Sequence, residues 1–159
     1  MAAETVMVVG MDESEHSQYA FHWTIEHFFS NSNSSSIFKL VVVHAKPSPT
    51  SSFALAGPGA IDVIPYIDFD LKKTASRIIE HAKTFCENKS VDNVHFEIVE
   101  GDPRSVLCDS VERHKADMLI VGSHGYGTFK RAVLGSVSDY CAHHAHCSVM
   151  IVKKPKSNH

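Results

Sequence analysis

Residues 118–138 read MLIVGSHGYGTFKRAVLGSVS, and this stretch shows the order of elements on which the fold prediction rests. It opens with the apolar run 118–121, which is typical of a strand buried on both faces of a sheet. A loop with four glycines follows, and a helix is predicted from Ser136 onward. The order strand, glycine-rich loop, helix places small residues next to the unpaired amides of a helix N-terminus.

Strands of the same kind are predicted on both sides of this stretch. Val6–Gly10 and Lys39–His44 repeat the short apolar run rich in β-branched residues. Val94–Glu100 alternates more regularly, and Val149–Val152 gives a last strand near the C-terminus. Together with the run that ends at Gly122, these segments make five predicted strands.

Helices are predicted between the strands. The clearest apolar stripe runs from Leu71 to Cys86, and a shorter one follows Ser14, a suitable N-cap. Another follows Asp102-Pro103, where the aspartate can cap and proline fits the first turn, and a last helix is expected over residues 136–145. About four helices that alternate with five strands predict one α/β domain over residues 1–159. Its doubly wound sheet is expected to be mostly parallel, with strand order 3-2-1-4-5.

Two segments are expected to lie outside this core. Residues 46–65 are rich in Ser, Pro and Gly, and we predict a flexible loop there, at the carboxyl end of the second strand. Residues 153–159 are predicted to form a polar tail.

Composition and charge exclude several classes of partner. The chain has 159 residues, 43% hydrophobic and 21% charged, which suits one globular domain. Its net charge of -3 gives no general attraction to nucleic acid or to an anionic membrane, so neither is expected as a partner. The N-terminus leads directly into a predicted strand, and no apolar run is long enough to span a membrane, so we expect a cytoplasmic protein. The four cysteines form no CxxC pair and are expected to be reduced.

The glycine-rich loop predicts an anion site. Glycines let backbone amides approach an anion closely, and the following helix N-terminus adds further amides and a positive dipole end. Lys130 or Arg131 can supply positive charge, and Ser136 and Ser138 can supply hydroxyl donors. The spacing GxxGxG differs from the dinucleotide pattern GxGxxG, and no GxxxxGK[ST] occurs in the chain.

The motif Gly122-x2-Gly125-x9-Gly135-Ser136 resembles the nucleotide-binding motif of the ATP-binding branch of the universal stress protein family. The likeness extends along nearly the whole chain. Val8–Ser14 resembles the first strand and acidic turn of the family, 42–45 its second strand, and 142–152 its closing helix and strand. One departure is Ser148, where the family often has proline.

This resemblance implies an adenine nucleotide, AMP, ADP or ATP, across the carboxyl ends of the first, second and fourth strands. Residues 10–12 would border adenine and ribose, and Ala45 would face the base. Residues 121–125 would line the ribose and first phosphates, and residues 135–138 would hold the remaining phosphates. The predicted nucleotide-binding residues, with the two basic residues of the loop, are Gly10, Met11, Asp12, Ala45, Val121, Gly122, Ser123, His124, Gly125, Lys130, Arg131, Gly135, Ser136, Val137 and Ser138.

The resemblance implies a stress-response or signalling module that acts through nucleotide-dependent conformation or association. A homodimer is expected through the C-terminal strand, whose free edge can pair with a second copy. No catalytic residue is assigned, because no Ser or Cys nucleophile with an orienting carboxylate accompanies His124. The alternatives are a slow ATPase or phosphotransferase that uses Lys130 or Arg131, and a scaffold that binds no nucleotide.

Two metal hypotheses also arise. Asp12 and Glu13 leave two interpretations open, either Mg2+ bound through the phosphates of a nucleotide or carboxylates that only accept hydrogen bonds. The run His143-His144-Ala-His146-Cys147 suggests zinc, but adjacent histidines point in different directions on a helix and no second ligand cluster exists. No metal site is therefore assigned.

Overall fold

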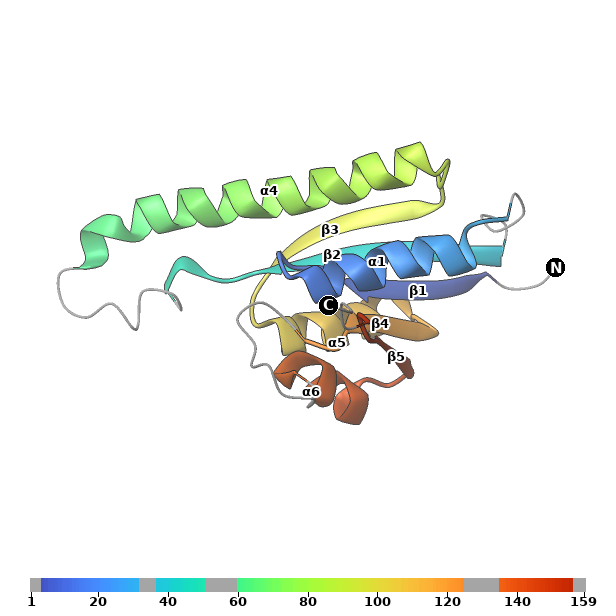
Figure 1. Cartoon of the computed structure of the whole chain (residues 1–159). Coiled ribbons are helices and arrows are strands. Elements are labelled where there is room, and N and C mark those ends of the chain that lie inside the picture. The colour runs from blue at the N-terminus through green and yellow to red at the C-terminus, as the bar shows by residue number, and fades with distance from the viewer. Residues whose placement is uncertain (1–3, 32–36, 51–59, 125–134, 156–159) are drawn as a thin grey trace.

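The computed structural model describes residues 4–31, 37–50, 60–124 and 135–155 (Figure 1). Five strands form one sheet: β1 (Thr5–Gly10), β2 (Phe38–Lys46), β3 (Val94–Glu100), β4 (Met118–Gly122) and β5 (Ser148–Val152). Their order is β3-β2-β1-β4-β5, and each of these neighbouring pairs is parallel. The predicted fold class and strand order are confirmed.

Helices cover both faces of the sheet, so alternate residues of each central strand face different layers. The helices are α1 (Glu15–Phe28), α4 (Ile64–Asn88), α5 (Pro103–His114) and α6 (Ser136–His144), with a 3-10 turn over Ala60–Val63. Met7 and Val9 of β1 belong to the apolar core that contains α1 and α4 residues. Val8 belongs to the opposite core with α5 and α6 residues. Continuous apolar strands are therefore required, as the sequence predicts.

The helix starts follow the predicted capping chemistry. Ser14 is the N-cap of α1, and its Oγ accepts a hydrogen bond from the amide of Ser17 at 3.1 Å. Asp102 is the N-cap of α5, and its carboxylate accepts from the amide of Arg104 at 2.8 Å, with Pro103 in the first turn.

Helix α4 is longer than the predicted stripe, and the predicted loop 46–65 is correspondingly too long at both ends. Lys46 still belongs to β2 and pairs in register with Glu100 of β3, while Ile64 already begins α4. Lys46 is buried, and its ammonium lies 3.4 Å from Glu100 and 3.6 Å from Asp68, which joins the end of β2 to α4. Residues 51–59 of the predicted loop lie outside the described residues.

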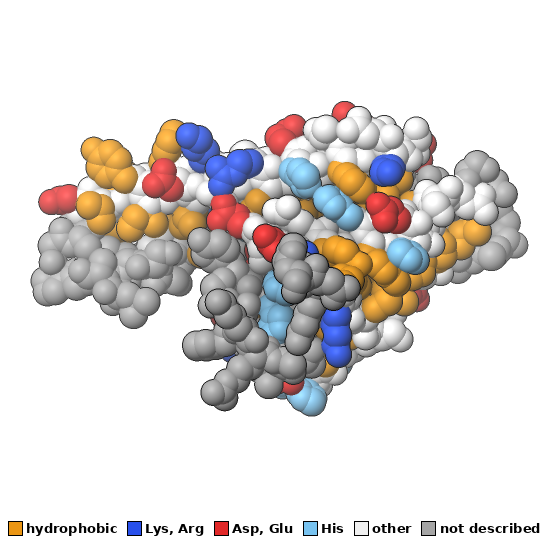
Figure 2. Space-filling view, in the orientation of Figure 1, with side chains coloured by type: hydrophobic (Ala, Val, Ile, Leu, Met, Phe, Trp, Pro, Cys, Tyr) orange, Lys and Arg blue, Asp and Glu red, His pale blue; other side chains and the backbone are white. Residues whose placement is uncertain are grey.

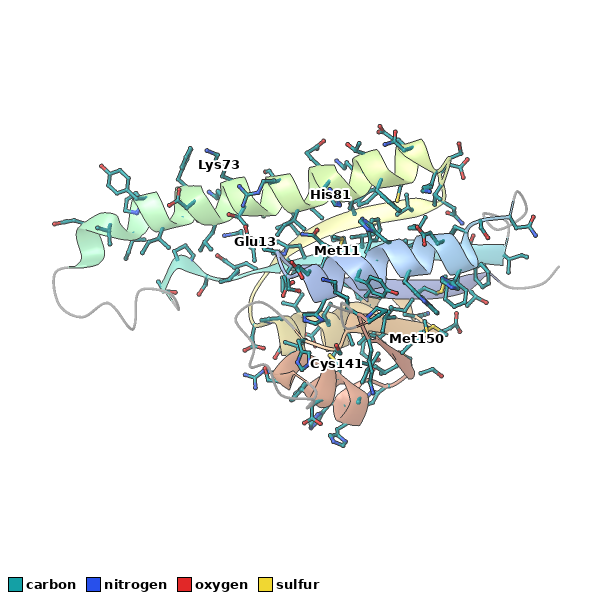
Figure 3. The ribbon with its side chains drawn as sticks, viewed as in Figure 1. Met11, Glu13, Lys73, His81, Cys141 and Met150 are labelled. Carbon is teal, nitrogen blue, oxygen red and sulfur yellow. The ribbon has the colours of Figure 1, made fainter. Side chains whose placement is uncertain are left out.

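The N-terminal half of α4 extends past the sheet, and apolar side chains gather on it (Figures 1 and 2). The other side of the sheet is covered by α5 and α6. Cys141 of α6, labelled in Figure 3, is completely buried in the core that also contains Leu107 and Val111 of α5. Of the predicted tail, Lys154 reaches back to α1, where its ammonium donates to Glu15 at 2.6 Å.

Candidate functional site

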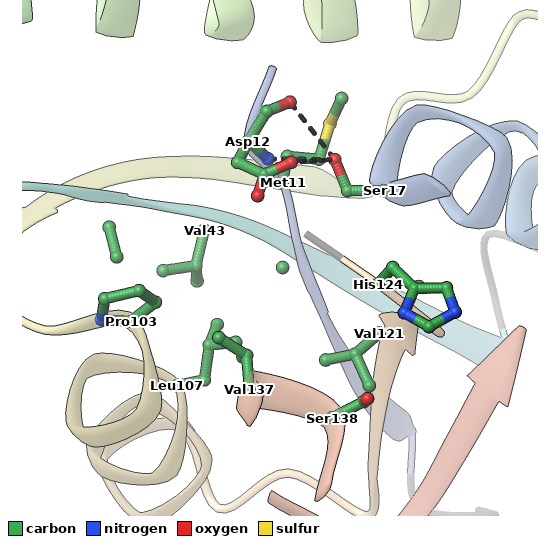
Figure 4. Close-up of a pocket in the computed structure, with 13 residues that line it drawn as sticks. Met11, Asp12, Ser17, Val43, Pro103, Leu107, Val121, His124, Val137 and Ser138 are labelled. Atoms are coloured by element: carbon green, nitrogen blue, oxygen red, sulfur yellow. Dashed lines mark hydrogen bonds between the residues drawn. The ribbon is translucent and has the colours of Figure 1, made fainter. Parts of the chain in front are cut away.

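A pocket opens at the carboxyl ends of β1, β2 and β4 (Figure 4). In a doubly wound sheet this is the switch point, because the chain leaves β1 toward β2 on one side and β4 lies on the other. The space between atoms, counted to the open mouth, is about 520 Å³. The lining residues are Gly10, Met11, Asp12, Ser17, Val43, Ala45, Pro103, Leu107, Val121, Gly122, His124, Val137 and Ser138.

Hydrogen bonds fix the turn between β1 and α1 against the pocket. The amide of Met11 donates to the carbonyl of Val43 at 2.9 Å, which extends the β1–β2 pairing by one residue. Asp12 Oδ1 accepts from the amide of Ser14 and from the hydroxyl of Ser17, both at 2.8 Å. The Asp12 amide donates in turn to Ser17 Oγ at 2.9 Å, so the carboxylate has a set position at the pocket wall (Figure 4).

Ser123 joins the ends of three elements. Its amide donates to the carbonyl of Val152 in β5 at 3.1 Å, and its carbonyl accepts from the amide of Gly135 at 2.7 Å. The hydroxyl of Ser138 is buried and lies 3.1 Å from the Ser123 carbonyl and 3.0 Å from that of Gly135. These bonds hold the start of α6 against the end of β4. The Ser138 hydroxyl donates its hydrogen to backbone carbonyls and not into the pocket.

The N-terminus of α6 lies beside the pocket without a side-chain cap. Gly135 is the N-cap residue, and no side-chain hydrogen bond caps this end. The first amides of a helix have no partner inside the helix, and the dipole favours negative charge there. Val137 and Ser138, in the first turn, line the pocket. This arrangement can accept an anionic group.

Gly122 has a packing role that the sequence argument missed. A Cβ built on Gly122 would lie 2.6 Å from the carbonyl oxygen of His16 and 2.9 Å from the amide nitrogen of Ser17. The first turn of α1 therefore packs against the end of β4 at a distance that only glycine permits. At Gly10 the nearest atom to a built Cβ is Leu107 Cδ1 at 2.8 Å, which belongs to a side chain rather than to the backbone.

Two histidines meet at the edge of the pocket. The rings of His16 and His124 lie 5.0 Å apart, edge to face, and His124 lines the pocket. Burial lowers the pKa of His16, and the nearby His124 and Lys154 lower it further. Nδ1 of His16 is buried and has no hydrogen-bond partner among the described residues. These features favour the neutral imidazole of His16.

The structure brings nine of the predicted residues to the pocket wall. They are Gly10, Met11, Asp12, Ala45, Val121, Gly122, His124, Val137 and Ser138. Ser123, Gly135 and Ser136 do not line it, and Gly125, Lys130 and Arg131 lie outside the described residues.

Four lining residues were missed by the sequence argument: Ser17, Val43, Pro103 and Leu107. The spacing Asp12-x-Ser14-x2-Ser17 is the one signal that could have indicated the role of Ser17, since short polar side chains near an N-cap bond to the turn. Val43 and Leu107 look like ordinary core residues in the sequence.

The histidine-rich segment near the C-terminus makes other contacts. His146 Nδ1 lies 2.6 Å from Glu112, and His144 Nδ1 lies 2.9 Å from the carbonyl of Tyr140. In the described part of the chain, no group of three or more His, Cys, Asp or Glu residues is arranged to hold a metal ion. None of the described helices is both long enough and apolar enough to span a membrane.

Comparison with known proteins gives a consistent family match. Residues 5–153 match the model of the universal stress protein family. The universal stress protein A-like protein of Arabidopsis thaliana is 33% identical over 138 residues, which cover 85% of this chain and 77% of that protein. Universal stress protein PHOS34 of the same plant is 32% identical over 92% of this chain, but this chain spans only 61% of the length of PHOS34.

Solved structures of the family share the fold. A universal stress protein family protein from Arabidopsis thaliana, solved with AMP bound, has a TM-score of 0.67 at 25% identity, over 95% of this chain and 92% of that chain. A universal stress protein from Lactobacillus plantarum has a TM-score of 0.74 at 19% identity, over 96% and 99% of the two chains. The second likeness supports the fold alone.

Proposed function

The chain belongs to the universal stress protein family, and from this premise we propose that the pocket at β1, β2 and β4 binds an adenine nucleotide. The observation that carries the proposal is the pocket itself. It lies at the switch point of the sheet, with an apolar floor, one carboxylate and an uncapped helix N-terminus around it. The Arabidopsis relative with AMP bound supports the choice of nucleotide.

The lining residues suggest how the ligand would be divided among them. The apolar side chains of Val43, Ala45 and Leu107 provide a surface for a flat base. Asp12 also lines the pocket, and its carboxylate could accept hydrogen bonds from sugar hydroxyls. The α6 N-terminus would receive the phosphates through its amides.

The fold modifies two details of the sequence-based site. Ser138 would contribute its amide rather than its hydroxyl, because the hydroxyl hydrogen is directed at the carbonyls of Ser123 and Gly135. Asp12 Oδ1 already accepts two hydrogen bonds, so a Mg2+ ion would be held mainly through the phosphates, as is usual for this ion. AMP, ADP and ATP all remain ligands under the proposal.

Nucleotide binding would act through conformation or association rather than through rapid chemistry. Ser123 is hydrogen-bonded both to β5 and to the start of α6. A phosphate bound at the α6 N-terminus would therefore affect the position of β5 at the edge of the sheet. The free edge of β5 would pair with a second copy to give a homodimer. The alternative, slow ATP hydrolysis, would require a basic group such as Lys130 or Arg131 at the phosphates.

The first test identifies any nucleotide carried by the protein. Freshly purified protein is denatured, and the released small molecules are analysed by mass spectrometry and compared with calorimetric titrations of AMP, ADP, ATP and GMP. We expect an adenine nucleotide in the released fraction, or adenine-specific binding in the titrations. Protein that carries none and binds none would refute the proposal. ATP recovered largely as ADP after incubation with purified protein would instead favour the hydrolase.

A matched pair of variants locates the binding. Ala45→Leu fills part of the pocket floor, whereas Ala142→Leu makes the same change at an exposed position of α6. We expect Ala45→Leu to weaken nucleotide binding by roughly tenfold or more, since a bulky group then occupies ligand space. Ala142→Leu should bind like the wild type. Equal binding by the two variants would place the ligand elsewhere.

A further inference from the structure

The N-terminal half of α4 exposes an apolar stripe that the fold does not use. The buried residues of α4 begin only at Ala75, although the helix begins at Ile64. Before Ala75, Tyr66 is 72% exposed and Phe69 is 66% exposed, and Val63 next to the helix is 43% exposed. These are three of the five exposed large apolar side chains in the described part of the chain.

Such clustering is uncommon on a protein surface. Single exposed apolar residues are ordinary, but contiguous patches mark interaction sites. Figure 2 shows several apolar side chains on this end of α4. Ion pairs hold the N-terminal half of α4 in place. The Asp68 carboxylate lies 2.9 Å from the Lys72 ammonium and 3.6 Å from the ammonium of the buried Lys46, at the end of β2. A fixed apolar surface is suited to a partner.

The charges at the two ends of this stripe have opposite signs. Tyr66, Phe69 and Lys73 are spaced i, i+3 and i+7, so they share one helix face. Asp62 precedes them in the 3-10 turn, and Lys73 lies on the outer side of α4, away from the sheet (Figure 3). Asp62 and Lys73 are exposed, and neither forms an ion pair with any described residue. The stripe therefore carries Asp62 at one end and Lys73 at the other, with Tyr66, Phe69 and the exposed Asp70 between them. Its two charged ends complement each other when the stripe is reversed.

We propose that this stripe, from Asp62 of the 3-10 turn to Lys73 of α4, binds the same stripe of a second copy in antiparallel orientation. A two-fold axis between Tyr66 and Phe69 brings Tyr66 against Phe69 of the partner subunit. The same axis brings Asp62 against Lys73 of the partner subunit. Each contact occurs twice, so the interface is isologous and each stripe takes one partner.

Only the N-terminal half of α4, which extends past the sheet, takes part in this pairing (Figure 1). The antiparallel arrangement therefore carries the two sheets to opposite ends of the paired helices. The pairing is also separate from any pairing through β5, because α4 packs over β2 and β3 while β5 is the opposite edge of the sheet. Both pairings can occur in one assembly.

The exposed area indicates a weak dimer. An aromatic side chain offers roughly 200 Å² of surface, so four rings that are 66% or 72% exposed would bury about 600 Å². Val63 and the methylene groups of Lys73 add to this area. The total buried area stays below the ~1,200 Å² that is typical of stable complexes. We expect a dissociation constant between ~10 μM and ~1 mM at low ionic strength.

Sedimentation velocity over a concentration series tests the pairing. Wild-type protein is compared with Tyr66→Ser/Phe69→Ser, Asp62→Lys and Lys73→Asp, at ~50 mM salt to limit screening. In a dimer of the Asp62→Lys variant, each end contact would join two lysines. In a dimer of the Lys73→Asp variant, each end contact would join two aspartates. We expect the aromatic variant to lose, up to ~500 μM, the association step that the α4 stripe adds to any β5 dimer. Each charge variant should make that step roughly tenfold more weakly. An equal mixture of the two charge variants restores opposite charges and should associate like the wild type.

The controls carry matched changes at other surfaces. Glu26→Lys makes the charge change of Asp62→Lys on α1, and Ile98→Ser removes an exposed apolar side chain of β3 that is 44% exposed. Both should associate like the wild type, and circular dichroism checks that every variant is folded. The proposal is refuted if the wild type does not associate, if the aromatic variant associates unchanged, or if the mixture is no better than its components. A dimer that persists in all α4 variants belongs to another surface, such as β5. The α4 proposal is also refuted if no association step is lost between the wild type and these variants.

Discussion

Replacing Gly122 by alanine should destabilise the fold through α1 rather than through the ligand. The added Cβ would lie 2.6 Å from the His16 carbonyl oxygen, whereas ordinary contacts begin near 3.4 Å. The first turn of α1 must then move away by a large part of an ångström. The next turns bury Ala20 and Phe21 completely and Ile25 almost completely, so this movement loosens the core.

The expected cost follows from overpacking. Forcing one extra carbon against backbone costs about 2–3 kcal/mol, which lowers Tm by about 4–12 °C in a chain of this length. Gly10→Ala is the matched control, because its Cβ would meet Leu107 Cδ1 at 2.8 Å and a side-chain end can rotate away. We expect it to cost about 1 kcal/mol or less. Both are measured by thermal and urea unfolding followed by circular dichroism.

The comparison of the two variants can contradict this reasoning. If Gly122→Ala unfolds within ~2 °C of the wild type, the close approach of α1 to β4 is wrong. If Gly10→Ala is the more destabilised variant, backbone contact does not decide the cost.

Three further predictions concern the pocket, pH and thiols. Asp12→Ala should lose two hydrogen bonds to the turn and cost about 1–3 kcal/mol in urea unfolding, whereas Asp12→Asn keeps an acceptor and should stay near wild-type stability; equal losses would contradict this. Burial, and then His81, lower the pKa of His22 below 6.5, so stability should fall as pH drops below 6.5, and His22→Gln should flatten part of that slope in unfolding measured across pH. Burial raises the pKa of Cys86 to about 11 and of Cys141 to about 12, so a disulfide reagent should reach these two thiols only after unfolding; rapid native reaction of all four cysteines would refute it.

Much of the fold could be predicted because its signals are local. Apolar strands, the Ser14 and Asp102 caps and the alternation of elements depend on neighbouring residues, and they imply the parallel order that the structure has. The start of α4 could not be predicted in the same way. Residues 64–70 bury no side chain completely, so they lack the periodic stripe from which a helix is recognised.

The candidate site was predictable in position but not in every role. Asp12 and Gly122 were predicted to lie side by side because each lies where a predicted strand ends, and both line the pocket in the structure. The reason for glycine at position 122 depends on the backbone of His16, which lies far away in the sequence. The hydrogen bonds of the Ser138 hydroxyl likewise form only because the start of α6 lies against the end of β4. No sequence pattern predicts this contact.

The hydrogen bond between the Ser123 carbonyl and the Gly135 amide, 2.7 Å long, has a consequence for how such a protein can vary. The two ends of residues 124–134 meet at one point of the scaffold, so neither β4 nor α6 depends on how many residues lie between them. Closing a longer segment costs little extra, about 0.6 kcal/mol for each doubling of its length. The scaffold therefore does not set the length of this segment, and the fixed spacing between Gly122 and Gly135 would be kept for the proposed ligand.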